Sequence, residues 1–402
     1  MGTLRIRNCT IWDVHYWRQT AGNDKDIAKP GTEGTLSFGV TYTLGVKRLH
    51  VSPDGKDYRS AVNPNGIYYA VWDNVSQKLQ ILTEEQANNY PITSDNKYLT
   101  NWIQKFPSWM SHLKGTYTLD RYTIPGTHDS GTKNTGDGAA HTQNFGIYDQ
   151  LQDGIRFLDI RLDGVTAFDN ELVVKHGCIL CFLNFSDVLN DCKTFLASNN
   201  RETIIMLVNA SGCLFNDIAS RFENYLAQDA YKNLFYLGDT LPTLDQVRGK
   251  VVLFRRFEAD TSDSPLGIDL SSGWLDNATF TLITPQEQHF QIEDQYAEHD
   301  THVKARVVDD ALGVALDNQG NGTMYITYNS ISSTLFHTPY MYAWGGSGID
   351  PALNPHLESF LAVRPGARHF GTVMLDFYNN QGSQNQLVEM LIAANEDLLE
   401  KE

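Results

Sequence analysis

The sequence of 402 residues predicts an α/β protein in which a (β/α) barrel follows a small all-β N-terminal domain. Two observations predict this fold. The first hundred residues contain strand patterns separated by turns rich in proline, glycine, asparagine and aspartate. The rest of the chain alternates short apolar strands with helical stretches, and the strands end in polar or ionisable residues. We therefore expect two domains, residues 1–98 and residues 99–402.

The N-terminal region is expected to form strands. The segment GTLSFGVTYTL (34–44) has an apolar side chain at every second position, the period of a strand with one buried face. NGIYYAVW (65–72) and SQKLQILT (76–83) are predicted as further strands, and a small antiparallel sandwich fits the pattern. Its aromatic residues either fill the core, which we favour, or supply a lipid- or glycan-binding surface: Trp12, Trp17, Tyr68, Tyr69 and Trp72.

The second region contains six predicted strands that each end in polar or ionisable residues. They are RYTIPGTHD (121–129), IRFLDIR (155–161), LVVKHG (172–177), TIIMLVN (203–209), KVVLFRR (250–256) and TVMLDF (372–377). Residues 186–199, with Ser186 as N-cap, and residues 386–399 are expected to be helices. In a (β/α) barrel, the loops after the carboxyl ends of the strands build the active site. A doubly wound open sheet also fits, although no glycine-rich dinucleotide fingerprint follows the first strand.

The composition narrows the classes of partner. The formal net charge of -17 argues against nucleic acid, because a phosphate backbone needs a basic footprint. An anionic ligand would have to be met by a local cationic pocket. No apolar run is long enough to cross a bilayer, so no transmembrane segment is expected. The first residues, MGTLRIRNCTIWDVHYW, do not resemble a signal peptide, which leaves the compartment open.

The chain has five cysteines, and an odd number cannot all pair within one chain: Cys9, Cys178, Cys181, Cys192 and Cys213. Cys178 and Cys181 form a CxxC pair directly after His176, with Cys192 downstream. This spacing is compatible with a zinc site or a redox pair. We expect most of the five to be reduced and buried, because small apolar thiols are common in protein cores and a zinc site usually brings a second close pair.

Two histidines at strand ends are the strongest candidates for catalysis. His128 follows one strand in GTHDS and His176 ends another in KHG. Two imidazoles suit phosphodiester cleavage, which needs a base for the attacking oxygen and an acid for the leaving oxygen. Between them, Asp159 and Arg161 share one face of a strand, from which an arginine can bind a phosphate. Asp376 ends the last strand, where its carboxylate can orient a histidine.

These segments resemble the bacterial phosphatidylinositol-specific phospholipases C, and related fungal and protozoan enzymes, over roughly residues 100–402. The shared motifs occur in the same order: NW followed by WM, IPGTHDSGT, GIRFLDIR, VVKHG, ETIIM, RGKVVLFRR, DQY, NP and a final DFY. IPGTHDSG is the most specific of them. The resemblance implies a distorted (β/α) barrel and cleavage of phosphatidylinositol to diacylglycerol and a cyclic inositol phosphate.

The resemblance also implies roles for individual residues. His128 matches the general base that takes a proton from the inositol 2-hydroxyl, and Asp376 matches the carboxylate that orients it. His176 matches the general acid for the diacylglycerol oxygen, with Asp129 as its partner. Arg161 matches the phosphate-binding arginine. No cofactor or metal is expected, because Arg161 stands where the metal-dependent branch of the superfamily has an acidic calcium ligand.

Further residues match the headgroup site of the family. Asp159 neighbours the phosphate-binding arginine, and Arg256, Asp294 and Tyr296 match residues that bind inositol hydroxyls or stack on the ring. The family carries a lysine where this chain has Asn209, so one cationic contact is lost. The short membrane-inserting helix of the family has no counterpart with a tryptophan in KNTGDGAAHTQNFGIYDQLQD.

We expect the substrate to be phosphatidylinositol, or a glycosyl-phosphatidylinositol lipid, at a membrane surface, and the chain to act as a monomer. Two other functions fit part of the pattern. A metal-dependent glycerophosphodiesterase shares a barrel and two histidines, but it normally has a glutamate cluster where GTHDS has an aspartate. A catalytically weak barrel that binds lipid or protein is disfavoured, because every catalytic position is filled.

Overall fold

The computed structural model describes residues 2–18, 26–38, 44–48, 56–59, 62, 66–73, 76–83, 86–87, 90, 106–165, 170–211, 217–364, 366, 368–379 and 386–400. The chain folds as two units, Met1–Phe106 and Pro107–Glu402. Each unit has its own hydrophobic core. No helix in the described residues has the length and apolar character needed to cross a membrane.

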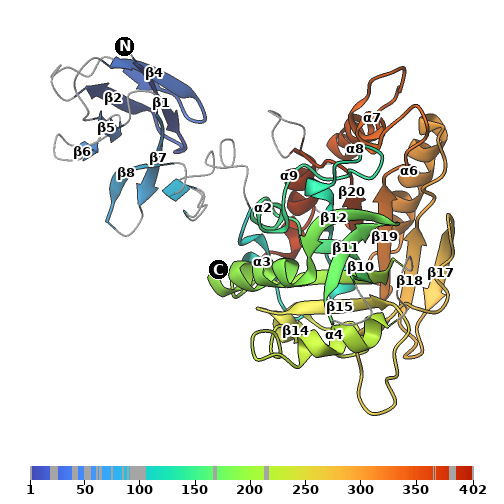
Figure 1. The fold of residues 1–402 in the computed structure, drawn as a ribbon. Coiled ribbons are helices and arrows are strands. Elements are labelled where there is room, and N and C mark those ends of the chain that lie inside the picture. The colour runs from blue at the N-terminus through green and yellow to red at the C-terminus, as the bar shows by residue number, and fades with distance from the viewer. Residues whose placement is uncertain are drawn as a thin grey trace. The chain divides into compact units, whose positions relative to one another are not determined.

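The N-terminal unit contains two four-stranded sheets, drawn in blue in Figure 1. One has the order β4 (Glu33–Phe38), β1 (Gly2–Asn8), β7 (Ile67–Asp73), β8 (Lys78–Leu82). The other has the order β3 (Asp26–Ala28), β2 (Val14–Arg18), β5 (Leu44–Arg48), β6 (Lys56–Arg59). Strands β1 and β7 are parallel, so the first sheet is mixed and not purely antiparallel as predicted.

The strand predicted over residues 34–44 is wrong as a single element. β4 ends at Phe38, and Leu44 begins β5 in the other sheet. The alternating positions Val40 and Tyr42 lie outside the described residues. Periodicity alone cannot show where a chain leaves one sheet for the next, because both halves bury alternate side chains.

The aromatic residues of this unit are part of its core. Trp17, Tyr68, Tyr69 and Trp72 are buried, and the Trp12 ring contacts the Trp72 ring edge-on at 5.3 Å. These four buried side chains are therefore not available to form a lipid- or glycan-binding surface. Filling the core was the favoured prediction, and it is confirmed.

The second unit is built on one curled, mainly parallel sheet. Its strands, in spatial order, are β14 (Phe235–Tyr236), β15 (Val251–Arg256), β13 (Ile204–Ala210), β10 (Phe157–Gly164), β9 (Ile124–Thr127), β20 (Thr372–Leu375), β19 (Thr323–Asn329), β18 (His289–Glu293) and β17 (Thr279–Ile283). Only β17 and β18 pair antiparallel in this series, and the two-residue β16 (Ile268–Asp269) adds to β15.

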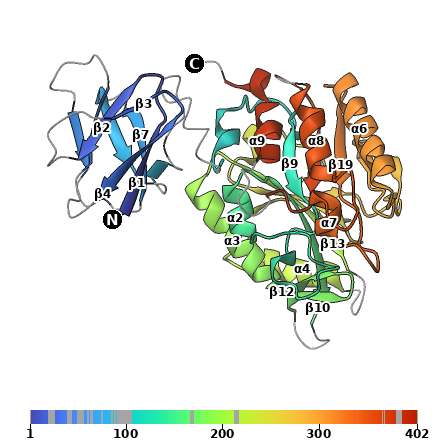
Figure 2. The same cartoon turned by 90° about the horizontal axis from the view of Figure 1, so that it is seen from above.

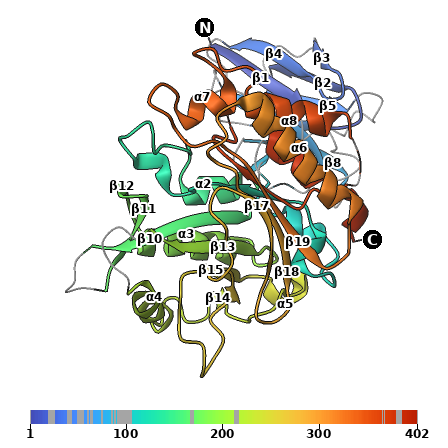
Figure 3. The ribbon, with the colours of Figure 1, turned by 90° about the vertical axis from the view of Figure 1, so that its right-hand side faces the viewer.

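The order of these strands is that of an incompletely closed barrel. The first strand, β9, lies between β10 and the last strand, β20, as in a (β/α) barrel. In the part of the chain that the structure describes, the end strands β14 and β17 do not pair with each other. Figure 3 shows the resulting curl, with β10, β13 and β15 turned steeply against β17 to β19. The predicted distorted barrel is confirmed in this form.

Helices cover the outside of the sheet. The longer ones are α3 (Phe185–Ser198), α4 (Ile218–Leu226), α6 (Thr301–Asp317), α8 (Leu353–Ala362) and α9 (Gln386–Ala393). Shorter ones are α2 (Ile147–Gln152), α5 (Leu244–Val247), α7 (Pro339–Trp344) and four 3-10 turns at Trp109–His112, Leu119–Arg121, Thr132–Asn134 and Glu396–Leu398. Figure 2 shows α6, α8 and α9 side by side.

The predicted N-cap of α3 needs correction. The cap is Asn184 and not Ser186, because Asn184 and Asp187 form a reciprocal capping box that satisfies two backbone N–H groups at the start of the helix. The apolar residue Phe185 opens the helix and is fully buried, which hides the start of the helix from a reading of polar residues alone.

The segment LVVKHG is a strand, but it is not a parallel barrel strand. β11 (Leu172–His176) pairs antiparallel with β10 and forms a hairpin with β12 (Ile179–Asn184). Val174 pairs with Leu162, so the chain runs back along β10 towards the active-site side. This reversal brings His176 back over the strand that carries Arg161.

Candidate active site

The pair of His128 and Asp376 is created by the pairing of the first and last barrel strands. Thr127 of β9 is in register with Leu375 of β20, and each is followed directly by a site residue. The His128 amide donates to the Leu375 carbonyl at 3.1 Å, and Gln143 donates to the carbonyls of both residues. The side chains meet with His128 Nδ1 2.8 Å from Asp376 Oδ1. The backbone thus fixes the geometry of this pair.

Asp129 joins the remaining groups of the site. Its φ of +44° lies in the left-handed region, which aspartate tolerates better than most residues. Its Oδ1 lies 2.8 Å from Arg161 Nε. Its Oδ2 lies 3.2 Å from Nε2 of both His128 and His176. One carboxylate therefore bridges an arginine and both predicted catalytic histidines.

The carboxylate of Asp159 holds the backbone turn at Asp129 by a hydrogen bond. It is fully buried on β10, and its Oδ2 accepts from the Asp129 amide at 3.3 Å and from Arg161 at 3.5 Å. Gly126 precedes the turn on β9, where a Cβ would lie 2.6 Å from Met374 Sδ and 2.9 Å from Phe157 Cβ. Only glycine fits this close approach of three strands.

His128 has a partner for Nε2 in either charge state. Neutral His128 can accept from Arg161, whose Nη2 lies 3.0 Å away, while Nδ1–H donates to Asp376. Protonated His128 can donate from Nε2 to Asp129 at 3.2 Å. Burial opposes the charge on His128, but Asp376 and Asp129 outweigh it and raise its pKa to about 9.

The electrostatics of the other groups follow from the same network. Burial lowers the pKa of His176, and Asp129 only partly offsets this effect. Burial would raise the pKa of Asp129, but Arg161 and the two histidines bring it below its usual range. Burial raises the pKa of Asp376, with His128 acting in the opposite direction. In the unliganded protein the proton of the histidine pair therefore resides mainly on His128.

A second row of polar groups lies beside this cluster. Arg161 of β10, Asn209 of β13 and Arg256 of β15 are in register across three adjacent parallel strands. The Arg256 guanidinium stacks on the Trp274 ring at 3.7 Å, and the Trp274 indole donates to Asp294 Oδ2 at 3.0 Å. Burial is the main cause of a lowered pKa for Arg256 and a raised pKa for Asp294.

Tyr296 is the last of the predicted headgroup-binding residues along the chain. Its hydroxyl donates to Asp276 Oδ1 at 2.7 Å, and this hydrogen bond is the main cause of its raised pKa. The ring is half-buried, which is compatible with a place at the edge of a binding site. Electrostatic contact links it to both Asp294 and Arg161.

Known proteins that resemble this chain are phosphatidylinositol-specific phospholipases C. The family model for Phosphatidylinositol-specific phospholipase C, X domain, matches residues 116–257. A 1-phosphatidylinositol phosphodiesterase of Staphylococcus aureus (strain Newman) is 32% identical over 279 residues, covering 66% of this chain and 88% of the relative. A protein of the same name from Listeria monocytogenes is 28% identical over 311 residues, covering 74% and 88%.

The chain belongs to the phosphatidylinositol-specific phospholipase C family. A solved phosphatidylinositol-specific phospholipase C from Staphylococcus aureus has a TM-score of 0.61 at 27% identity and covers 71% of this chain and 97% of that one. The enzyme of that name from Listeria monocytogenes has a TM-score of 0.56 at 24% identity, covering 72% and 99%, and supports the fold.

Two residues of this phospholipase C family site were missed from the sequence. Trp274 lies in the segment after β16, where nothing in the local pattern distinguishes it from a surface aromatic. Tyr328 lies on β19 and is buried, with its ring edge-on to His128 at 5.8 Å. The segment TMYITYNS, an apolar strand ending in polar residues, carried the same signal as the six predicted strands.

Several buried polar atoms around the histidines lack a hydrogen-bond partner in the described part of the chain. They include Asp129 Oδ2, His176 Nδ1, Asp376 Oδ2 and the Tyr328 hydroxyl. Asp129 Oδ2 still has ion-pair contacts. Leaving such groups unpaired is costly, so their concentration at one place indicates a site that a polar ligand completes.

Within the described residues, one group of side chains has ligand atoms close enough together to hold a metal ion, and it belongs to this cluster. Single oxygen or nitrogen atoms of His128, Asp129 and Asp159 lie within 4.8 Å of one another. Arg161 already contacts all three side chains, at 3.0, 2.8 and 3.5 Å. A fixed positive charge therefore already lies against all three groups.

The four cysteines that the structure describes do not form a shared site. Cys178 is disulfide-bonded, whereas Cys181, Cys192 and Cys9 are free and buried. Since Cys181 is free, it is not the partner of Cys178, and the CxxC pair is neither a redox disulfide nor a zinc ligand pair in this structure. The prediction that most of the cysteines are reduced and buried agrees with Cys9, Cys181 and Cys192, and Cys178 is the exception among the described cysteines.

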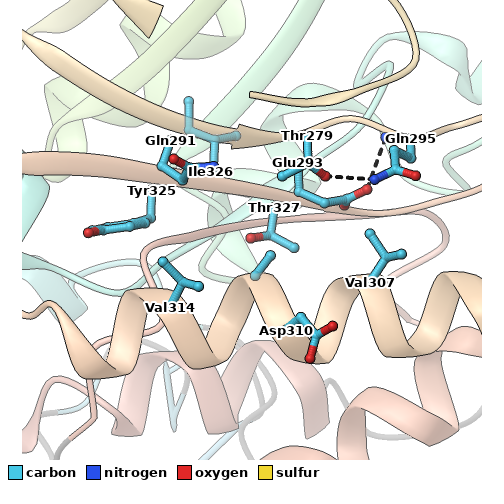
Figure 4. A pocket seen from close by; sticks show the side chains of 11 residues that line it. Thr279, Gln291, Glu293, Gln295, Val307, Asp310, Val314, Tyr325, Ile326 and Thr327 are labelled. Atoms are coloured by element: carbon cyan, nitrogen blue, oxygen red, sulfur yellow. Dashed lines mark hydrogen bonds between the residues drawn. The ribbon is translucent and has the colours of Figure 1, made fainter. Parts of the chain in front are cut away.

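A separate hollow of about 240 Å³ lies between α6 and the strands β17 to β19 (Figure 4). Val307 and Val314 of α6 face Gln291, Glu293 and other side chains of the sheet across it. None of the predicted site residues lines this hollow. It is therefore distinct from the cluster that carries the chemistry.

Proposed function

We propose that this chain is a phospholipase C that cleaves phosphatidylinositol to diacylglycerol and a cyclic inositol phosphate. The observation that carries this proposal is the arrangement of two histidines and an arginine around the Asp129 carboxylate. It lies in a chain whose relatives are named 1-phosphatidylinositol phosphodiesterases. A base, an acid and a phosphate-binding cation are the groups that intramolecular phosphodiester transfer requires.

The proposed reaction assigns one role to each group. His128 Nε2 takes the proton of the inositol 2-hydroxyl, whose oxygen attacks phosphorus, while Asp376 holds the ring through Nδ1. Arg161 binds the phosphate oxygens and offsets their charge. The bond from phosphorus to the glycerol oxygen breaks, and His176 gives that oxygen a proton. Attack from within the substrate has the advantage of a unimolecular step.

The test of this proposal is product analysis with phosphatidylinositol vesicles. We expect diacylglycerol and cyclic inositol phosphate in equal amounts, with slow hydrolysis of the cyclic ester afterwards. Phosphatidylcholine vesicles serve as the control, since they offer no neighbouring hydroxyl for attack. Release of phosphatidic acid, or no product at all, would contradict the proposal. We also predict that the chain cleaves glycosyl-phosphatidylinositol lipids and that it acts as a monomer.

The pH dependence of kcat/KM should follow the shared proton of the two histidines. The reaction needs one histidine neutral and the other protonated, so activity requires one proton on the pair. We expect activity to be lost above about pH 9, where His128 is deprotonated, and in acid, where His176 with its lowered pKa also gains a proton. Asp376→Asn should move the upper limb to lower pH, because Asp376 is the main charge that holds this proton. An unmoved upper limb would contradict the assignment.

Activity is expected to be independent of divalent metal. Arg161 supplies the positive charge at the place where His128, Asp129 and Asp159 converge. Assays in excess EDTA and in added Ca²⁺ should agree within about twofold, a difference of under ~0.5 kcal/mol in transition-state stabilisation. Loss of activity in EDTA with recovery in Ca²⁺ would place this chain in the metal-dependent branch.

Exposed apolar side chains near the active-site end of the barrel fit a membrane surface. Phe182 is 71% exposed on β12, and Leu335 and Phe336 are 90% and 77% exposed after β19. Exposed aromatic and aliphatic groups of this kind bind the boundary between headgroups and acyl chains. The double change Leu335→Ser and Phe336→Ser should weaken vesicle binding about tenfold or more, and leave cleavage of monomeric dihexanoyl-phosphatidylinositol unchanged. Equal losses on both substrates would contradict a membrane role.

We also propose that residues 1–98 form an accessory domain without a role in the chemistry. Every residue assigned above to the active site lies beyond residue 126, and the N-terminal sheets have a core of their own. The domain boundary and any partner of this region remain predictions from the sequence.

A further inference from the structure

Tyr328 stands out among the tyrosines of the barrel because its hydroxyl is buried and has no hydrogen-bond partner within the described residues. The residue is 1% exposed, near the carboxyl end of β19. Tyr325 on the same strand is also buried, but its hydroxyl accepts from Asn321 Nδ2 at 2.9 Å. Tyr325 also lines the hollow beside α6, whereas Tyr328 contacts His128. The two side chains therefore lie on opposite faces of the sheet.

The environment of the Tyr328 hydroxyl is the active site itself. The ring packs edge-on against His128, with an interplanar angle of 82°. The phenol interacts electrostatically with two carboxylates and two guanidinium groups, those of Asp159, Asp294, Arg161 and Arg256. Burial and the two carboxylates raise its pKa well above the usual value. The hydroxyl is therefore neutral, and it is both a donor and an acceptor.

A buried hydroxyl without a partner costs free energy that a bound ligand recovers. We propose that the Tyr328 hydroxyl hydrogen-bonds a ring hydroxyl of the inositol headgroup, which makes Tyr328 a specificity-determining residue. The proposal rests on the phospholipase C function proposed above. An alcohol is the matching ligand group, because it also donates and accepts. The phosphate, which only accepts, is already met by Arg161 and the protonated histidine.

This assignment also gives the headgroup site a polar contact that balances the one lost at Asn209. Asn209 lies between Arg161 and Arg256 in the strand register, where it contributes an amide in place of a cation. A neutral phenol across the site selects for a hydroxyl-rich ring through directed hydrogen bonds. Choline and ethanolamine headgroups have no such hydroxyl.

The first test compares Tyr328→Phe with the wild type on phosphatidylinositol, with Tyr325→Phe as the matched control on the other face of β19. Tyr328→Phe should lower kcat/KM about tenfold, mainly through KM, since the hydrogen bond is present in both ground state and transition state. Inhibition by free myo-inositol should weaken by a similar factor. Tyr325→Phe should leave both quantities within twofold of wild type.

The second test uses phosphatidylinositol analogues that each lack one ring hydroxyl other than the attacking one. Removal of the hydroxyl that Tyr328 binds should abolish the difference between wild type and Tyr328→Phe, while the other analogues retain it. A difference that persists with every analogue, or no difference on phosphatidylinositol, overturns the inference. A wild-type protein that cleaves no phosphatidylinositol overturns the proposed function as well, so the two failures are distinguishable.

Discussion

Replacing His128 with alanine should lower kcat for phosphatidylinositol by roughly 10²–10⁴-fold, the usual contribution of a general base. The loss should appear in kcat more than in KM, because His128 removes a proton only as the attacking oxygen bonds to phosphorus. The Nδ1 contact with Asp376 and the backbone hydrogen bond of His128 hold its ring in one orientation. Release of cyclic inositol phosphate from vesicles measures the effect.

A matched control is available in the same barrel. His356 on α8 forms a similar pair with Asp309 on α6, with Nε2 3.0 Å from Oδ2, but it lies among the outer helices. His356→Ala should leave kcat within about twofold, since no group that contacts the substrate depends on it. If His128→Ala kept more than a tenth of wild-type activity while remaining folded, His128 would not be the base.

Replacing Arg161 with lysine should lower kcat by roughly 10²–10³-fold, although the charge is kept. The guanidinium reaches Asp129, Asp159 and His128 from one planar group, and an ammonium cannot make these contacts together. The remaining lysine charge should preserve part of the phosphate binding. The change in KM is therefore expected to be smaller than the change in kcat.

Arg364→Lys is the matched control for this substitution. The Arg364 guanidinium stacks on the Phe360 ring at 3.6 Å, close to the end of α8 and away from the site residues. Its replacement should leave turnover unchanged. Thermal unfolding of both variants separates a loss of fold from a loss of chemistry. Near-normal turnover by a folded Arg161→Lys protein would show that the planar guanidinium is not needed.

The sequence predicted the barrel and most of its strands because each strand combines an apolar run with a polar end. It did not predict strand direction, since periodicity describes one strand and pairing is a property of two. LVVKHG therefore looked like a parallel barrel strand, whereas it returns along β10. The strands β17, β18 and β19 were not among the six predicted strands, although the same patterns are present there.

The sequence predicted those residues of the candidate site that occur in specific motifs, such as His128 and Asp129 in IPGTHDSG. The strand register now accounts for the approach of His128 and Asp376, which the resemblance had only implied. Trp274 and Tyr328 belong to no quoted motif, and their place in the site depends on the curl of the sheet. The state of Cys178 was missed because a disulfide depends on distances between segments and not on spacing along the chain.

The contact between His128 and Asp376 joins residues that are 248 positions apart, one directly after the first barrel strand and one directly after the last. A chain that is still being synthesised has His128 long before it has the carboxylate that orients it. We expect His128 to be oriented only when residues 372–375 pair with residues 124–127, which closes a long loop. A chain that lacks residues 372–376 lacks the carboxylate that contacts His128, so we expect such a chain to cleave phosphatidylinositol poorly.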